Sequence, residues 1–186
     1  MTSSNLRIVG IAGSLREKSY NRAVLAAAAR DLAPDGMTID ICDIAGVPLY
    51  NEDDRAAGNP PAVDDLRGRI AQADGVLIAT PEYNYSMPGV LKNAIDWASR
   101  PPDQPFDGKP VAILGASPGR LGTARAQYHL RQVFIFLNAM VMNKPEVMVS
   151  SVHEILGDDG SITDEATADI IGAQLQAFAD WIRKIG

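Results

Sequence analysis

Two short, uninterrupted apolar runs constrain the fold of this chain more than any other feature. They read DGVLIAT at 74–80 and PVAILGAS at 110–117. Neither run alternates with polar residues, and each ends at a small or polar residue. Strands of this kind are buried on both faces, which requires helices on both sides of a parallel sheet. The sequence therefore predicts an α/β fold.

The rest of the chain alternates between strand-like and helix-like segments. Further strands are predicted at 6–14, 37–44 and 141–149, and helices at 21–33, 61–73, 89–99, 124–139 and 163–185. This alternation favours a doubly wound parallel sheet of five strands with helices on both faces. We expect Thr163 to cap the last helix, with two acidic residues in its first turn. No repeat or long linker interrupts the pattern, so we expect a single domain over residues 1–186.

Composition narrows the class of protein. The 186 residues are 46% hydrophobic, enough for one core, and the net charge of −6 argues against nonspecific binding of nucleic acid. No apolar run approaches the roughly 20 residues of a membrane span, and no secretory signal is visible at the N-terminus. The only cysteine, Cys42, excludes an internal disulfide and a cysteine-based metal cluster. We expect a cytoplasmic protein without a metal site, and Cys42 as a buried packing residue.

The stretch GIAGSLREKSYNRAVL, residues 10–25, joins the first strand to the first helix. A helix N-terminus attracts phosphate through its unpaired N–H groups and its partial positive charge. Ser14, Ser19 and Asn21 offer further donors after Gly13. Arg16 offers a charge-assisted contact worth roughly 1.5–3 kcal/mol. The alternative is an ordinary turn in which Ser19 caps the helix and Arg16 is solvated. The combination favours a phosphate site.

The kind of phosphate ligand follows from what the first loop lacks. It has no G-x-x-x-x-G-K-[ST] motif, and Gly10 and Gly13 do not complete G-x-G-x-x-G. A bridging pyrophosphate needs close backbone approach over glycines, whereas a terminal monophosphate can be surrounded by side chains. We therefore expect a terminal monophosphate.

A second loop, TPEYNYSMPGVLKNAIDWASR at 80–100, follows the buried strand 74–80. Ligands of doubly wound sheets bind beyond the carboxyl ends of the strands, where Glu82, Tyr83 and Asn84 would lie. A flat heteroaromatic ring could rest there, against Tyr83 and the polar groups of the loop. The alternative is a helix-entry turn in which the tyrosines only pack.

The third loop, GASPGRLGTARAQ at 115–127, follows the strand 110–117. Its glycines allow close approach of a ligand, and Ser117 could hydrogen-bond to it. Arg120 and Arg125 could hold a second, transient anion. They could equally be solvated or contact another subunit.

The first two loops together resemble the NADPH-dependent FMN reductase family, and within it the bacterial quinone and chromate reductases. The resemblance rests on GSLREKSYN followed by PEYNYSMPGVLKNAIDWASR, and it extends through 108–146. It implies a flavodoxin-like fold with strand order 2-1-3-4-5. It also implies noncovalent FMN, with its phosphate in the first loop and its isoalloxazine ring against PEYN.

The resemblance assigns cofactor contacts to all three loops. The expected cofactor-binding residues are Gly13, Ser14, Leu15, Arg16, Ser19, Tyr20, Asn21, Pro81, Glu82, Tyr83, Asn84 and Ser117.

No side chain is expected to carry out the chemistry itself. The two histidines, His129 and His153, lie in a predicted helix and after the last strand, and no nucleophile–base pair is evident. Hydride transfer through flavin N5 needs neither. We expect a ping-pong cycle in which NADPH or NADH reduces FMN and leaves. A quinone, a free flavin or a chromate-like oxyanion then accepts the electrons.

Three other functions remain open. A flavodoxin-type electron carrier would share the fold and cofactor but lack NAD(P)H oxidation. The loop after the second strand offers Tyr50 but no tryptophan to cover the flavin, which favours an open ring face. A phosphoacceptor signalling domain needs an aspartate where IATPEYN has none. A nucleotide-binding module without catalysis is the last alternative.

The helix 124–139 and the residues after it predict self-association. HLRQVFIFLNAMVM is apolar nearly all round, whereas a surface helix of a monomer has a polar face. Members of the resembled family form dimers and tetramers, so we expect a homo-oligomer in which a neighbouring subunit could complete the flavin pocket. Arg125, Tyr128 and Glu146 are candidate polar contacts there. Burial within one subunit is the alternative.

Overall fold

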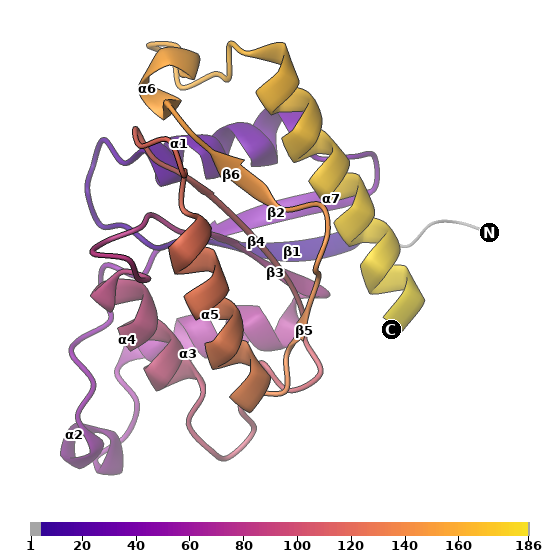
Figure 1. Cartoon of the computed structure of the whole chain (residues 1–186). Coiled ribbons are helices and arrows are strands. Elements are labelled where there is room, and N and C mark those ends of the chain that lie inside the picture. The colour runs from indigo at the N-terminus through magenta and orange to yellow at the C-terminus, as the bar shows by residue number, and fades with distance from the viewer. Residues whose placement is uncertain (1–4, 186) are drawn as a thin grey trace.

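A parallel sheet forms the middle layer of the computed structural model, which describes residues 5–185 (Figure 1). Its strands are β1 (Leu6–Ala12), β2 (Met37–Cys42), β3 (Gly75–Ala79), β4 (Pro110–Ala116), β5 (Met140–Val141) and β6 (Val147–Val149). The strand order is β2-β1-β3-β4-β5, with β6 also paired to β4, and every pair is parallel. The predicted flavodoxin-like order is confirmed.

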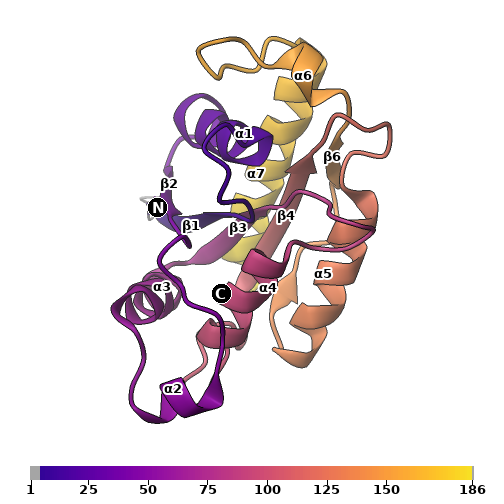
Figure 2. The same ribbon diagram turned by 90° about the vertical axis from the view of Figure 1, so that its left-hand side faces the viewer.

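Helices cover both faces of the sheet, as Figures 1 and 2 show. They are α1 (Tyr20–Ala27), α2 (Glu52–Ala56), α3 (Pro61–Gln72), α4 (Gly89–Ala98), α5 (Ala124–Phe136), α6 (Val152–Ile155) and α7 (Glu165–Ile185). A π-helical segment, Ala28–Leu32, continues α1. Helices α1 and α7 lie on one face, and α3, α4 and α5 on the other.

Strand β4 shows why the apolar runs are uninterrupted. Val111 and Ile113 belong to the apolar cluster beneath α3, α4 and α5. Ala112 and Leu114, which alternate with them, belong to the cluster beneath α1 and α7. All four are fully buried, so a polar residue on either side of this strand would lie in a core.

The predicted strand at 141–149 is interrupted. Strand β5 pairs with Pro110–Val111 and β6 pairs with Leu114–Ala116, so both lie along the same edge of β4. Pro145 lies between them and has no N–H to donate to the ladder, which explains the break. The expected fifth position of the sheet is filled by two short strands.

Two helix boundaries also differ from the expectation. The helix predicted at 124–139 ends at Phe136. Thr163 does not cap the last helix, because its hydroxyl donates to the Ile155 carbonyl. Asp164 takes that place, since its carboxylate accepts the N–H of Thr167 at 2.8 Å. An aspartate one residue closer to the helix reaches the free N–H groups directly.

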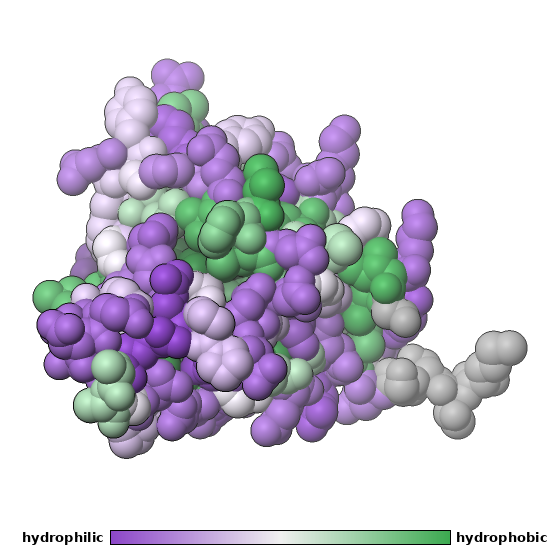
Figure 3. Space-filling view, turned by 90° about the horizontal axis from the view of Figure 1, so that it is seen from below, coloured by the Kyte–Doolittle hydropathy of each residue, from purple (hydrophilic) through white to green (hydrophobic). Residues whose placement is uncertain are grey.

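The outer surface carries apolar side chains that the fold leaves uncovered. At the end of α5, Ile135 is 78% and Phe136 is 88% exposed. Figure 3, which looks at the molecule from below, shows apolar side chains gathered among charged ones on that side. None of the helices within residues 5–185 combines the length and the apolar character that crossing a membrane requires.

Because the end of β4 is closely packed, we expect that replacing Gly115 lowers the stability of the protein. A Cβ at this position would overlap Thr123 Oγ1 and the Thr80 carbonyl oxygen, and both threonines are fully buried. We expect Gly115→Ala to lower the free energy of unfolding by about 1–3 kcal/mol, as overpacking typically does. Urea unfolding measures the loss.

Gly172→Ala is the matched control, because a Cβ on this residue of α7 would meet nothing within 4 Å. Alanine favours a helix over glycine by about 0.8–1 kcal/mol, so this variant should be as stable as the wild type or more so. Equal urea midpoints for the wild type and Gly115→Ala would contradict the packing described above.

Candidate cofactor site

Three loops meet where β1, β3 and β4 end. They connect β1 to α1, β3 to α4, and β4 to α5. The N–H of Gly13, at the start of the first loop, donates to the Ala79 carbonyl at 2.9 Å. A Cβ on Gly13 would lie 3.0 Å from Leu91 Cδ2 and 3.4 Å from Pro81 Cδ. The predicted first and second loops are therefore in contact, and a glycine lets them approach.

The first loop presents hydroxyl groups beside the N-terminus of α1. Ser14 and Ser19 are buried, while Leu15 and Arg16 are exposed. Ser19 caps α1 by accepting the N–H of Arg22, and Ser14 Oγ accepts the N–H of Arg16, both at 3.4 Å. Bonds this long are weak, so both hydroxyls remain available to a ligand with a stronger acceptor. The Ser19 cap of the alternative interpretation is present and is compatible with phosphate binding.

Asn21 ties the first loop to the third. Its side-chain amide donates to the Ala116 carbonyl, and its oxygen accepts the Ala116 N–H, both at 2.9 Å. One amide hydrogen remains for a ligand. Contact between Asn21 and a phosphate therefore stays a prediction, and the structure adds a role in fixing α1 against the end of β4.

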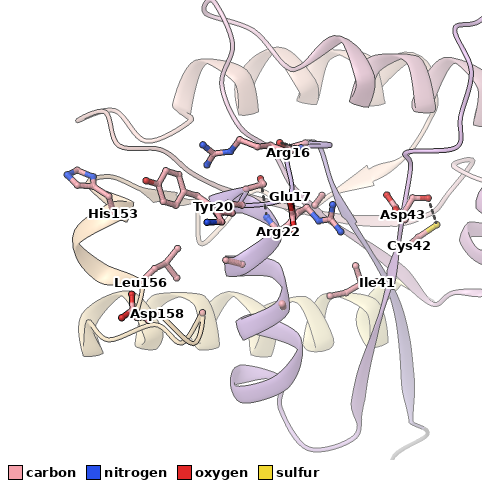
Figure 4. Close-up of a pocket in the computed structure, with 18 residues that line it drawn as sticks. Arg16, Glu17, Tyr20, Arg22, Ile41, Cys42, Asp43, His153, Leu156 and Asp158 are labelled. Atoms are coloured by element: carbon pink, nitrogen blue, oxygen red, sulfur yellow. Dashed lines mark hydrogen bonds between the residues drawn. The ribbon is translucent and has the colours of Figure 1, made fainter.

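A cavity of about 850 Å³ lies beside the first loop (Figure 4). Ser14, Arg16, Ser19 and Tyr20 line it together with residues that sequence reasoning did not place there. The added lining comes from the end of β2 and the region of α6, and includes Ile41, Cys42, Asp43, His153, Leu156 and Asp158. The other predicted cofactor-binding residues are not among its lining residues: Gly13, Leu15, Asn21, Pro81 to Asn84 and Ser117. The region of α6 lines the same cavity as α1, a tertiary arrangement that no local motif signals.

The tip of the second loop is a tight two-residue turn. Tyr83 N–H donates to Ser86 O at 2.9 Å, and Ser86 N–H donates to Tyr83 O at 3.0 Å. The two residues between them, Asn84 and Tyr85, have φ values of 51° and 68°. Positive φ at both central positions is typical of a type I′ turn, and it is rare for tyrosine. The turn leaves Tyr83 50% and Tyr85 72% exposed.

Glu82 faces away from solvent and caps α5. Its side chain is only 5% exposed, and its carboxylate accepts the N–H groups of Arg125 at 3.0 Å and Ala126 at 3.1 Å. It also forms an ion pair with the Arg125 guanidinium. Thr123 makes no capping bond of its own, so Glu82 supplies the negative charge that a helix N-terminus favours. Its contact with a cofactor stays a prediction.

Arg125 is held within the chain. The hydrogen bond to Glu82 raises the pKa of Arg125 above its ordinary value. The guanidinium carbon also lies 3.7 Å from the centre of the Tyr85 ring. Of the two arginines proposed for a transient anion, Arg120 is the exposed one without such an ion pair among residues 5–185.

Two other predicted contacts are likewise satisfied internally. Tyr128 donates to Glu146 at 3.1 Å, and this bond raises the pKa of Tyr128. Ser117 Oγ donates to the Gly122 carbonyl at 2.6 Å and accepts the Gly119 N–H at 3.2 Å. The third loop is therefore folded onto Ser117, whose only proton is already used.

Cys42 is inert although it lines the cavity. Burial raises the pKa of its thiol to about 11, so the thiol stays protonated near neutral pH. Between residues 5 and 185, no cluster of three or more His, Cys, Asp or Glu side chains is placed to hold a metal ion.

The donor set of the site fits a flavin mononucleotide. Two buried hydroxyls, an exposed guanidinium and a helix N-terminus suit a phosphate monoester. The Gly13–Pro81 contact places the first loop beside the second, which carries the turn with exposed Tyr83; contact of that turn with the same ligand stays a prediction.

The cap formed by Glu82 leads to a prediction about stability. We expect Glu82→Gln to lower the free energy of unfolding by about 1–3 kcal/mol, because the amide loses the charge that binds Arg125 and α5. The control is Asp96→Asn, which breaks the Lys92–Asp96 pair between half-exposed side chains at 2.7 Å. That change should cost less than about 1 kcal/mol. Equal losses in chemical denaturation would contradict the cap.

Comparison with known proteins agrees with this geometry. The family model for NADPH-dependent FMN reductase matches residues 6–154. An NAD(P)H-dependent FMN reductase of Pseudomonas aeruginosa is 57% identical, and a quinone reductase of Escherichia coli K12 is 47% identical; each alignment covers 98% of both chains.

Solved structures show the same relationship. The flavoenzyme NAD(P)H:(acceptor) oxidoreductase FerB of Paracoccus denitrificans superimposes with a TM-score of 0.88 at 40% identity. That match covers 97% of this chain and 99% of the other. The resemblance inferred from the GSLREKSYN and PEYN segments is confirmed, and the chain belongs to the NADPH-dependent FMN reductase family.

Proposed function

We propose that the protein is an FMN-dependent NAD(P)H oxidoreductase that reduces quinones or similar small acceptors. The observation that carries the proposal is the contact of the first loop with the second at Gly13 and Pro81, two residues before the exposed Tyr83–Ser86 turn. When bound, FMN accepts a hydride at N5 and passes electrons to the acceptor. Relatives named for quinone reduction support the acceptor class, among them a 2-hydroxy-1,4-benzoquinone reductase of Burkholderia at 45% identity.

The first loop holds the phosphate end in this proposal. Ser14 and Ser19 donate their hydroxyl protons to phosphate oxygens, and the N–H groups at the start of α1 add further donors. Arg16 supplies local positive charge in a chain whose net charge is −6. Leu15 and Tyr20 flank the phosphate and the polyol chain.

The second loop orients the ring. Pro81 is buried against the first loop, and Tyr83 and Asn84 project from the turn towards solvent. In the proposal, the Asn84 side chain and backbone N–H groups of the loop meet the polar edge of the ring. Such donors stabilise negative charge without any titrating acid or base.

If one face of the flavin ring is open, we expect NAD(P)H and the electron acceptor to use it in turn. The loop after β2 carries Tyr50 but no tryptophan, and the tip residues Tyr83 and Asn84 are exposed. NAD(P)H therefore binds, is oxidised and leaves before the acceptor binds at the same face. An oxyanion such as chromate would meet that face too, and the exposed Arg120 offers a positive charge to attract it.

We also propose a cytoplasmic homo-oligomer. The exposed Ile135 and Phe136 at the end of α5 are apolar surface that association would bury. A reduced, buried Cys42 fits a reducing compartment.

Anaerobic mixing of FMN-loaded protein with NADPH tests the redox proposal. The yellow colour should bleach, and adding a quinone should restore it. Steady-state rates at several quinone concentrations should give parallel double-reciprocal lines. Persistent colour would indicate an electron carrier instead, while intersecting lines would reject only the alternation of ligands.

The phosphate role of Arg16 has its own test. Arg16→Ala should weaken FMN binding about tenfold, because a charge-assisted hydrogen bond is lost. Binding of riboflavin, which has the ring but no phosphate, should not change. Quenching of flavin fluorescence measures both affinities. Arg30→Ala is the control, since Arg30 pairs with Asp31 outside the site. An equal loss for both flavins would contradict the assignment.

A further inference from the structure

The Tyr83–Ser86 turn adopts a backbone conformation that its own sequence disfavours. Tyr85 has φ 68°, a region that residues with a Cβ enter reluctantly and where glycine is the usual choice. The neighbouring Asn84, at φ 51°, tolerates this region better. A turn of this kind persists when surrounding structure holds it in place.

One helix, α5, contacts the turn and the residue before it. Helix α5 binds Glu82, just before the turn, through two N–H groups and the Arg125 guanidinium. The same guanidinium lies 3.7 Å from the Tyr85 ring centre. One helical turn further along, His129 Nδ1 is joined to Ser86 Oγ by a 2.8 Å hydrogen bond. Residues four apart share a helix face, so one side of α5 contacts three residues of the second loop, Glu82, Tyr85 and Ser86.

We propose that His129 and Arg125 are positioning residues, which fix the Tyr83–Ser86 turn from outside the cofactor site. The inference rests on the proposed function, because the turn matters for redox chemistry only if a flavin ring lies against it. His129 contacts Ser86 and acts through it. Tyr83 and Asn84 then meet the ring in a geometry that is set before the ligand arrives, which reduces the ordering cost of binding.

His129 and Arg125 are proposed to affect binding of the flavin ring, whereas the first-loop contacts affect binding of the phosphate. Arg16 belongs to the first loop, so its loss weakens FMN and spares riboflavin. His129 holds the loop proposed to meet the ring, so its loss weakens both flavins by the same factor. The ratio of the two affinities therefore separates positioning of the ring from binding of the phosphate.

Two single variants and their combination test the proposal. His129→Ala and Ser86→Ala should each weaken riboflavin and FMN about three- to tenfold, the range expected for one hydrogen bond. The double variant should lose no more than either single one, because both remove the same bond. His129→Asn should restore affinity to within about twofold, since its side chain keeps a hydrogen-bonding atom near the Nδ1 position.

Amide hydrogen exchange supplies a measurement that needs no flavin. In the flavin-free chain, the Tyr83 and Ser86 amides, which bond across the turn, should exchange about three- to tenfold faster in His129→Ala. Gln132→Ala is the matched control, an exposed position on the same helix that should leave exchange and affinity unchanged. Should His129→Ala fail to fold, the exposed Ser86–His129 bond can still be removed from its other end by Ser86→Ala.

Failure of this proposal is distinguishable from failure of the proposed function. Unchanged exchange and unchanged flavin affinity in both single variants would overturn the positioning role and leave the redox function standing. An additive loss in the double variant would show that His129 does not act through Ser86. A wild-type chain that binds no flavin would overturn the function, while the exchange rates would still decide whether α5 holds the turn.

Discussion

The burial of β3 and β4 on both faces is the constraint from which the rest of the molecule follows. Every residue of these two strands is buried, so helices must cover the sheet on either side. All strands run parallel, so their carboxyl ends lie at a single edge of the sheet. The loops after β1, β3 and β4 therefore converge, and their side chains assemble a site although they lie far apart in the chain.

The convergence of the three loops does not by itself fix their positions. Specific polar contacts hold the loops against one another and against α5. Asn21 joins the first loop to the start of the third, while Glu82 joins the second to α5. In both cases a buried polar side chain satisfies backbone groups that would otherwise lack partners. The predicted ligand contacts and these structural contacts involve the same residues, so the prediction implies that cofactor binding would stabilise this edge of the sheet.

The sequence was sufficient for the parts of the site that depend on local order. Gly13, Ser14 and Ser19 could be placed between a strand and a helix because these elements follow one another within a short stretch; their contact with the cofactor stays a prediction. Residue Glu82 was located correctly at the strand end, but its partner on α5 could not be foreseen from spacing along the chain.

The same limit explains the other differences. His129 looked remote from the site because it lies in the middle of a helix, and only the packing of α5 brings it against Ser86. The break at Pro145 was missed because the apolar residues on either side of it read as one strand. Tertiary pairing with β4, rather than local preference, decides where β5 and β6 begin and end.

That interruption also governs how the sheet ends. An exposed strand edge is a template on which another chain can add, and natural proteins protect such edges with short strands and proline. Here β5 has two residues and β6 has three, with Pro145 between them. An incoming strand would find no continuous row of backbone donors and acceptors along this edge. The break between β5 and β6 therefore protects the protein against edge-to-edge aggregation.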